Sequence, residues 1–366
     1  MDMSNTRIKK LQSILHKKQA AACFITNQKN IFYLTGFIGI SPYEHESTLL
    51  ITTNQAYLYI PQMYRDRAMA VVHTDITLVT DLPKGLFGSW TMHATTGTIV
   101  CESENLTLAE FDTLQGHTTA TLLPEKGIVA ALRLYKDDTE IAALKKASAM
   151  TDKAFTHIQE FIAKRMYTRL CEHDVIEELR RYSHALGSHG FGFDPIVAYG
   201  PGSAEPHYIS NNTPIKPGNV LLIDMGFVVD GYTSDFSRTL SLGAPTDEFT
   251  RIYALVQETQ QACLDACKPG ASTTTLYTLS QDIFTKHGVA DLYLHSLGHG
   301  VGLDVHEAPR LASSHDTILK PGMVITIEPG LYLSNQFGVR IEDLVLITED
   351  GYELLTTSSK KMISLV

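Results

Sequence analysis

The sequence has few of the features that mark disulfide scaffolds, membrane proteins and nucleic-acid binders. Five cysteines occur among 366 residues and none forms a CxxC pair, so neither a disulfide framework nor a thiolate zinc site is expected. The most apolar run, NVLLIDMGFVV, is interrupted by Asp224, and no run approaches the roughly 18 apolar residues of a transmembrane helix. Thirty basic residues against 40 acidic residues give a net charge of −10, which argues against a nucleic-acid surface.

The N-terminal segment also lacks a feature, the uninterrupted apolar stretch of a signal peptide. Residues 1–18, MDMSNTRIKKLQSILHKK, instead space Ile8, Leu11, Ile14 and Leu15 along one face of a basic amphipathic helix. Together with the few, unpatterned cysteines, this segment predicts a cytoplasmic protein.

The length of the chain predicts two domains. Residues 1–125 alternate strand-like and helical patterns, which favours an α/β layer, and residues 126–366 form the second expected domain. In the second domain, apolar residues recur at three- and four-residue steps from Ile141 to Ile162, so a long helix is predicted from about Asp138. Further helices are expected at about 172–186 and 248–267.

The second domain contains a sequence repeat. KPGNVLLIDMG at 216–226 and KPGMVITIEPG at 320–330 share six identical residues. In each copy a Pro-Gly turn precedes a buried strand that ends in an acidic residue. A unit used twice predicts two similar halves related by a pseudo-twofold axis.

The repeat would collect acidic side chains in one place. Asp224 and Glu328 end the two apolar strands, and the returning strands are expected to carry Asp235 and Glu342. Four carboxylates in a shared apolar interior are very costly unless cations accompany them. Two divalent cations would balance the four charges, and carboxylate ligands favour harder ions such as Mn²⁺.

A histidine in a glycine-rich segment would complete such a site. His299 lies between Gly298 and Gly300, where the absence of side chains lets the backbone approach a ligand. Alone, such a histidine is more often a core residue in a turn, and scattered acids are more often on the surface. As an ordered set they predict a two-metal centre, whose use is metal-assisted hydrolysis. His207 and His306 are candidates for substrate binding or proton transfer.

Several motifs together resemble those of the proline-specific metallopeptidases of the pita-bread fold, aminopeptidase P and prolidase, with creatinase and methionine aminopeptidase as relatives. The motifs are NIFYLTGF at 30–37, FDPIVA at 193–198, IDMG at 223–226, SDFSRT at 234–239, the segment 295–306, IEPGLY at 327–332 and VRIED at 339–343. The resemblance implies an α+β protein. Its C-terminal domain would have the pita-bread fold with pseudo-twofold symmetry, and a smaller α/β creatinase-like domain would precede it.

The resemblance also implies roles for individual residues. Two divalent metal ions, Mn²⁺ first with Co²⁺ or Zn²⁺ as alternatives, would be bound by Asp224, Asp235, His299, Glu328 and Glu342. Glu328 would also shuttle a proton during catalysis. His207 and His306 would contact the substrate and stabilise the tetrahedral intermediate. His295 would line the specificity pocket and bind the substrate. Tyr332, near the metals, would also bind the substrate, and Arg340 would orient a ligand carboxylate.

The implied reaction is hydrolysis of the bond between an N-terminal residue and proline, in peptides with proline in second position. An Xaa-Pro aminopeptidase is the first expectation. A prolidase that acts only on dipeptides and a non-catalytic pita-bread binding module are the alternatives. The resemblance further implies a homodimer or homotetramer, with no nucleic-acid or membrane partner.

Overall fold

The computed structural model describes residues 3–41 and 44–365, and it divides into two compact units, Met1–Arg133 and Leu134–Val366. The first two residues of the expected N-terminal amphipathic segment lie outside the described residues. The domain boundary expected between residues 125 and 126 stays a prediction.

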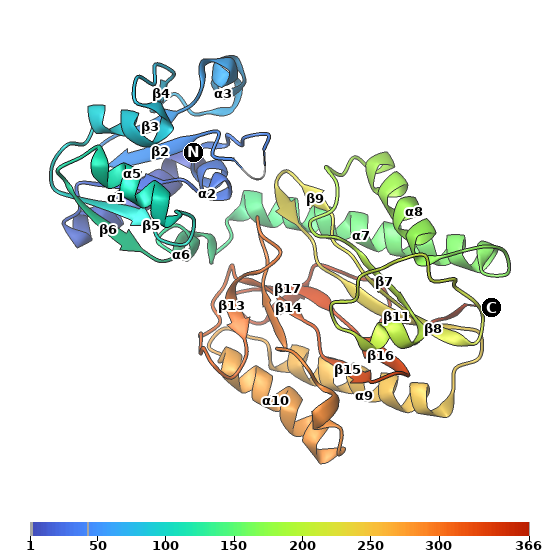
Figure 1. The fold of residues 1–366 in the computed structure, drawn as a ribbon. Helices are drawn as coiled ribbons and strands as arrows, with labels where there is room; N and C mark the ends of the chain where they lie inside the picture. Colours follow the sequence, from blue (N-terminus) through green and yellow to red (C-terminus); the bar gives the residue numbers. More distant parts are fainter. Residues whose placement is uncertain (1–2, 42–43, 366) are drawn as a thin grey trace. The chain divides into compact units, whose positions relative to one another are not determined.

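The N-terminal unit is built on a mixed sheet with the strand order β4-β3-β2-β1-β5-β6 (Figure 1). The strands are β1 Ala22–Ile25, β2 Thr48–Thr52, β3 Ala56–Tyr59, β4 Ile76–Val79, β5 Thr98–Glu102 and β6 Thr121–Glu125. The helices are α1 Met3–Lys18, α2 Gln28–Thr35, α3 Arg65–Val71, α4 Gly85–Gly88, α5 Leu108–Gly116 and α6 Ala130–Arg133, with the short turns η1 Gln62–Tyr64 and η2 Ser89–Met92.

Local sequence explains these elements. The amphipathic pattern of the first segment forms α1, in which Leu11 and Leu15 are fully buried. Within the NIFYLTGF region, α2 begins after Asn27, whose side chain accepts two backbone N–H groups, and ends at Gly36, whose φ of +77° suits glycine. These signals, an N-cap and a left-handed C-terminal glycine, fix the helix at both ends.

The C-terminal unit contains two larger and mainly antiparallel sheets, with the orders β19-β11-β8-β7 and β13-β12-β14-β17-β18. Their strands are β7 Ile196–Tyr199, β8 Asn219–Asp224, β11 Ser237–Leu242, β12 Gly298–Gly300, β13 Glu307–Leu311, β14 Val324–Ile327, β17 Asp343–Ile347, β18 Tyr352–Leu354 and β19 Ser364–Leu365. Two short hairpins pair β9 Val228–Val229 with β10 Tyr232–Thr233 and β15 Gly330–Leu333 with β16 Phe337–Arg340. In the first sheet only β19 is parallel to its neighbour.

The two copies of the sequence repeat form equivalent pairs of strands. In the first copy β8 pairs antiparallel with β11, and in the second β14 pairs antiparallel with β17. The turns that start the two copies are also alike, because Gly218 and Gly322 have φ values of +95° and +85°, a region that favours glycine. The pairing therefore follows the repeat, as the sequence predicted.

Two pairs of helices cover the two sheets (Figure 1). The helices are α7 Asp138–Arg165, α8 Glu172–Ala185, α9 Asp247–Ala266 and α10 Thr273–Lys286, with the short turns η3 Gly200–Ala204 and η4 Ala290–Leu292. The predicted stripe on α7 is buried from Leu144 to Ile162, where Ile158 and Ile162 pack with Leu221 and Ile223 of β8, whereas its first member, Ile141, is only half-buried. α9 and α10 pack on β14 and β17 through a second cluster that includes Leu264.

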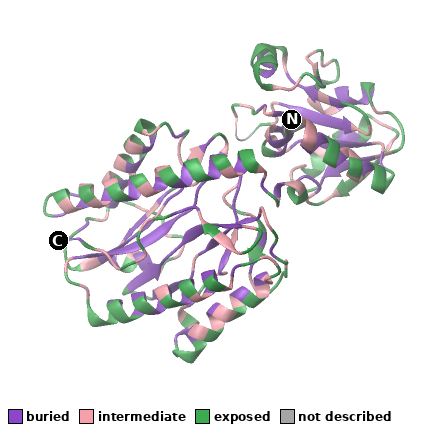
Figure 2. Cartoon of the chain, turned by 180° about the vertical axis from the view of Figure 1, so that it is seen from behind, coloured by how far each residue is buried: buried purple, intermediate pink, exposed green. Residues whose placement is uncertain are grey.

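The distribution of buried residues agrees with this arrangement of sheets and helices. Figure 2 shows buried strands inside the C-terminal unit, while the helices alternate buried and exposed residues along their lengths. Among the helices of residues 3–41 and 44–365, none combines the length and apolar character needed to cross a bilayer. The free energy gained by burying apolar side chains in this unit therefore comes from the two sheet–helix interfaces.

Candidate metal centre and active site

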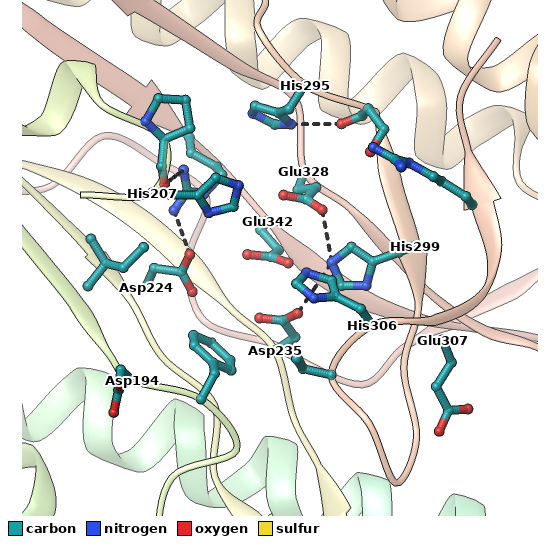
Figure 3. Close-up of a pocket in the computed structure, with 17 residues that line it drawn as sticks. Asp194, His207, Asp224, Asp235, His295, His299, His306, Glu307, Glu328 and Glu342 are labelled. Atoms are coloured by element: carbon teal, nitrogen blue, oxygen red, sulfur yellow. Dashed lines mark hydrogen bonds and ion pairs between the residues drawn. The ribbon is translucent and has the colours of Figure 1, made fainter. Parts of the chain in front are cut away.

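A cavity of about 560 Å³ in the C-terminal unit brings together residues that the sequence analysis selected (Figure 3). The selected residues that line it are His207, Asp224, Asp235, His295, His299, His306, Glu328, Arg340 and Glu342. Tyr332 is the one selected residue that does not line this cavity in the described part of the chain.

The two repeat copies supply the four carboxylates, with small differences from expectation. Asp224 ends β8, as predicted, and Glu328 directly follows β14, one residue beyond the strand that it was expected to end. Asp235 and Glu342 are not within the returning strands but just before them, because β11 starts at Ser237 and β17 starts at Asp343. Both carboxylates therefore lie just outside the paired strands, where they line the cavity.

The imidazole of His299 lies close to the carboxylates of the cluster. Its Nε2 lies 3.2 Å from Glu328 Oε1 and 3.7 Å from Asp235 Oδ2. One ligand atom each of Asp235, His299 and Glu342 lie within 4.8 Å of one another. His299 Nδ1 is 3.1 Å from the Gly300 carbonyl oxygen, which can only accept, so Nδ1 carries a proton and Nε2 faces the carboxylates.

Burial and mutual repulsion perturb the acids. Burial, reinforced by neighbouring carboxylates, raises the pKa of Asp235 and of Glu342 well above the ordinary range. Burial also raises the pKa of Asp224, against the opposing charge of Arg340. Burial alone would lower the pKa of His299, but its contact with Glu328 outweighs this and raises that pKa to about 9.

The donor set fits divalent cations. Asp224 Oδ1 is buried and has no hydrogen-bond partner among the described residues, which is costly for an acceptor away from water. The protons favoured on Asp235, Glu342 and His299 occupy positions where a cation would satisfy the same atoms. Carboxylates with one imidazole suit Mn²⁺, Co²⁺ or Zn²⁺.

Arg340 joins the two halves of the carboxylate cluster. Its Nη2 donates to Asp224 Oδ2 in a buried ion pair, and its Nε donates to Ser237 Oγ at 2.9 Å. Ser237 Oγ in turn donates to Glu342 Oε2 at 2.5 Å. Ser237 is fully buried and was not selected from the sequence. It holds Glu342 through the same hydroxyl that accepts from Arg340.

His295 in the cavity wall and Tyr332 behind it form a connected pair. The Nδ1 of His295 lies 2.7 Å from the Ser296 carbonyl oxygen and must donate to it. Its Nε2 therefore accepts from the Tyr332 hydroxyl at 2.8 Å, and Arg340 Nη1 donates to that hydroxyl at 2.8 Å. Both ring nitrogens of His295 are thus occupied, and Tyr332, only 3% exposed, supports His295.

His207 and His306 line the cavity, and both are exposed. The rings of His306 and His299 meet edge to face with centroids 4.3 Å apart. Partial burial of its ring, followed by the nearby charge of His299, lowers the pKa of His306. A neutral imidazole there still has one N–H to donate to a substrate oxygen.

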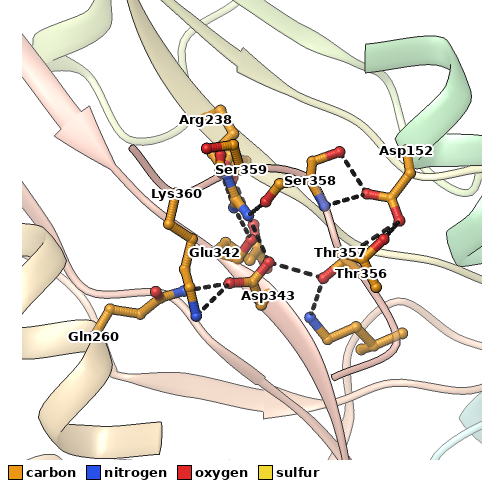
Figure 4. A network of polar contacts seen from close by, with 12 residues as sticks. Asp152, Arg238, Gln260, Glu342, Asp343, Thr356, Thr357, Ser358, Ser359 and Lys360 are labelled. Atoms are coloured by element: carbon orange, nitrogen blue, oxygen red, sulfur yellow. Dashed lines mark hydrogen bonds and ion pairs between the residues drawn. The ribbon is translucent and has the colours of Figure 1, made fainter. Parts of the chain in front are cut away.

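A second buried network holds the backbone of Glu342 (Figure 4). Arg238 donates to the Glu342 carbonyl oxygen and forms an ion pair of 2.6 Å with Asp343, and both side chains are 1% exposed. Gln260 Nε2 and Thr356 Oγ1 donate to the two oxygens of Asp343 at 2.8 Å and 3.0 Å. The peptide that follows the last acidic residue of the cluster is therefore anchored from several elements.

Sequence reasoning missed several residues that contribute to the site. Ser237 lies two positions after Asp235 in the SDFSRT motif, and that proximity was the available signal. Glu307 and Arg310 also line the cavity, in the segment that follows His306. No local pattern in the sequence distinguishes either of them from a solvated charge on a strand.

Comparison with known proteins agrees with this geometry. Residues 142–349 match the family described as Metallopeptidase family M24. The chain belongs to this family. Residues 7–135 of this M24 metallopeptidase match the Creatinase/Prolidase N-terminal domain. The expected family, the pita-bread fold and the creatinase-like N-terminal domain are thereby confirmed, and the chain is a hydrolase of the metallopeptidase class.

Individual relatives cover almost the whole M24 chain. An Xaa-Pro dipeptidase from Pyrococcus horikoshii is 31% identical over 99% of this chain and 100% of its own length. The solved structure of an Xaa-Pro dipeptidase from Bacillus anthracis is 32% identical, with a TM-score of 0.92 over 99% of this chain and 100% of that one. An X-Pro aminopeptidase structure from Thermotoga maritima is 29% identical, with a TM-score of 0.84 over 94% and 98%.

Proposed function

We propose that this protein is an Xaa-Pro dipeptidase, which hydrolyses dipeptides whose second residue is proline. The two relatives described above at 31% and 32% identity are named for this activity, whereas the X-Pro aminopeptidase structure, which has the activity expected first from the sequence, is 29% identical. The comparisons therefore favour the alternative of the sequence analysis over its first expectation.

The observation that carries this proposal is Arg310 in the wall of the cavity. A dipeptide differs from a longer peptide in having a free carboxylate directly on proline, and a guanidinium is the side chain best suited to bind a carboxylate through two hydrogen bonds. Arg310 pairs with His299 in the β12–β13 register, so it stands beside the carboxylate cluster. Among the described residues no carboxylate forms an ion pair with it, which leaves the guanidinium available for substrate.

In this proposal two divalent cations, Mn²⁺ first with Co²⁺ or Zn²⁺ as alternatives, are held by Asp224, Asp235, His299, Glu328 and Glu342. When bound, they supply Lewis acidity and lower the pKa of water.

The residues around the ions would carry out the remaining steps. Glu328, next to His299, moves a proton from the attacking water to the proline nitrogen. His207 and His306 donate hydrogen bonds to the carbonyl oxygen as it gains negative charge. Because both nitrogens of His295 are engaged by the protein, His295 offers a ring surface to the substrate rather than a donor. Arg340 orients Asp224.

The test compares substrates of different length. The protein is stripped with chelator, reloaded with Mn²⁺, and assayed with Ala-Pro, with the tripeptide Ala-Pro-Ala and with the amide of Ala-Pro. We expect hydrolysis of the free dipeptide and little of the other two. Arg310→Met should raise KM for Ala-Pro by about 10- to 100-fold, the range for one lost bidentate contact to a charged group, while Arg310→Lys should fall between.

Each remaining outcome selects another function. Hydrolysis of the tripeptide with an inert dipeptide would refute the proposal in favour of an aminopeptidase. No turnover of any substrate with metal bound would favour the non-catalytic binding module. A homodimer or homotetramer and a cytoplasmic location remain predictions.

A further inference from the structure

The loop between β12 and β13 carries His306 but has little regular structure of its own. Residues 301–306 form neither helix nor strand, and the β12–β13 pairing is irregular next to them, between His299 and Gly300. His306 is exposed, so few neighbours pack against it. Besides its edge-to-face contact with His299, the position of its ring therefore depends on contacts elsewhere along the loop.

One such contact is the carboxylate of Glu307, around which the loop folds. Glu307 Oε1 accepts a hydrogen bond of 3.0 Å from the backbone N–H of Asp304. A Cβ atom added at Gly302 would lie 2.7 Å from Glu307 Oε2, which shows how closely the loop backbone approaches the carboxylate. The carboxylate thus fills the inside of the turn that leads to His306.

The charge of this carboxylate is balanced by a lysine far away in the sequence. Lys136 Nζ lies 3.3 Å from Glu307 Oε2, and the two side chains are 1% and 8% exposed. The backbone N–H of Lys136 donates to the Gly322 carbonyl oxygen at 2.7 Å, in the turn that starts β14. Lys136 is therefore fixed to the strand that leads to Glu328.

We propose that Lys136 and Glu307 are a positioning pair for His306. Their buried ion pair ties the loop 301–306 to the base of β14, so that His306 is held against His299 at the cavity. Removing one partner takes away the opposite charge of this ion pair from a buried group, and the loop would have to move to let water reach that group. This inference rests on the proposed function in assigning His306 a catalytic contact.

Lys136→Met is the direct test, because Lys136 does not line the cavity. With Mn²⁺-loaded protein and Ala-Pro, kcat should fall by about 10- to 100-fold, since a small misplacement of a catalytic group has effects of this size. The same change made together with His306→Ala should cause no further fall, because both act through one group. Lys145→Met removes a solvent-exposed ion pair between Lys145 of α7 and Glu353 of β18, and it serves as the matched control with unchanged kcat.

A second measurement does not depend on activity. Hydrogen exchange of the metal-free protein, followed by mass spectrometry, should show faster exchange in residues 301–307 for Lys136→Met and not for Lys145→Met. Should Lys136→Met fail to fold, Lys136→Met combined with Glu307→Gln removes both charges of the pair, and the same faster exchange is expected.

The outcomes separate this inference from the proposed function. Unchanged exchange in residues 301–307 would overturn the positioning pair, and so would an equal loss of kcat in the presence and absence of the His306 side chain. If wild-type protein failed to hydrolyse Ala-Pro, the proposed function would fall, while the exchange experiment would still decide whether the pair holds the loop.

Discussion

Replacing Ser237 by alanine should weaken metal binding while leaving the fold intact. The hydroxyl of Ser237 donates to Glu342 Oε2 at 2.5 Å and accepts from Arg340 Nε at 2.9 Å, in a fully buried position. Its loss frees the Glu342 carboxylate to rotate and leaves Arg340 Nε without this acceptor. The change removes one oxygen atom, so the cavity that it leaves is small.

The expected magnitude follows from the charge of the acceptor. A hydrogen bond to a charged group contributes about 1.5–3 kcal/mol, and about 1.4 kcal/mol corresponds to a tenfold change in affinity. The Kd for Mn²⁺ should therefore rise by about 10- to 100-fold, the range also expected when a group that orients a metal ligand is lost. Activity lost at low Mn²⁺ should return in part at high Mn²⁺.

Isothermal titration calorimetry of the metal-free protein measures this change directly. Ser241→Ala is the matched control, because Ser241 lies in the same strand, is buried, and donates only to the Gly243 carbonyl oxygen. An affinity for Mn²⁺ that is the same in Ser237→Ala as in Ser241→Ala would show that Ser237 does not orient Glu342.

Three further results are expected. Chelation should lower the melting temperature, and the decrease should be larger at about pH 8 than at about pH 6. The pKa values of Asp235, Glu342 and His299 are raised in the metal-free fold, which therefore prefers their protonated forms and loses stability as the pH rises. Equal melting temperatures with and without chelator would contradict a buried carboxylate cluster. Mn²⁺ binding at neutral pH should release protons, seen as a calorimetric heat that depends on the ionisation enthalpy of the buffer, and a heat independent of buffer would refute those protonated states. Glu328→Gln should reduce kcat by about 10²- to 10⁴-fold with little change in folding, and a near-normal kcat would remove Glu328 from the role of proton shuttle.

Much of the fold could be predicted because its signals are local. The stripe from Ile141 to Ile162 and the capping residue Asp137 define α7, and both act through neighbours within a few turns of the same helix. The Pro-Gly turns at 217–218 and 321–322 set the start of the two repeat strands in the same way. The repeat therefore places Asp224 at the end of β8 and Glu328 directly after β14.

The sequence did not predict the features that depend on strand register and on the direction of side chains. Asp235 and Glu342 precede their strands by two residues and one residue, a detail set by the pairing of Asp224 with Ser237 and of Ile327 with Asp343. Tyr332 lies behind His295 instead of on the cavity wall, because its hydroxyl is taken up by His295 and Arg340.

The sequence by itself determined that acidic side chains and one histidine recur in matched strand contexts, since apolar runs, turns and repeats are written in adjacent residues. Tertiary structure alone decided which groups hold them in place. Lys136 meets Glu307 across 171 positions and Ser237 meets Glu342 across 105, and contacts of that separation depend on how sheets and helices pack. The identity of the ligands is a local property, whereas their orientation belongs to the whole folded unit.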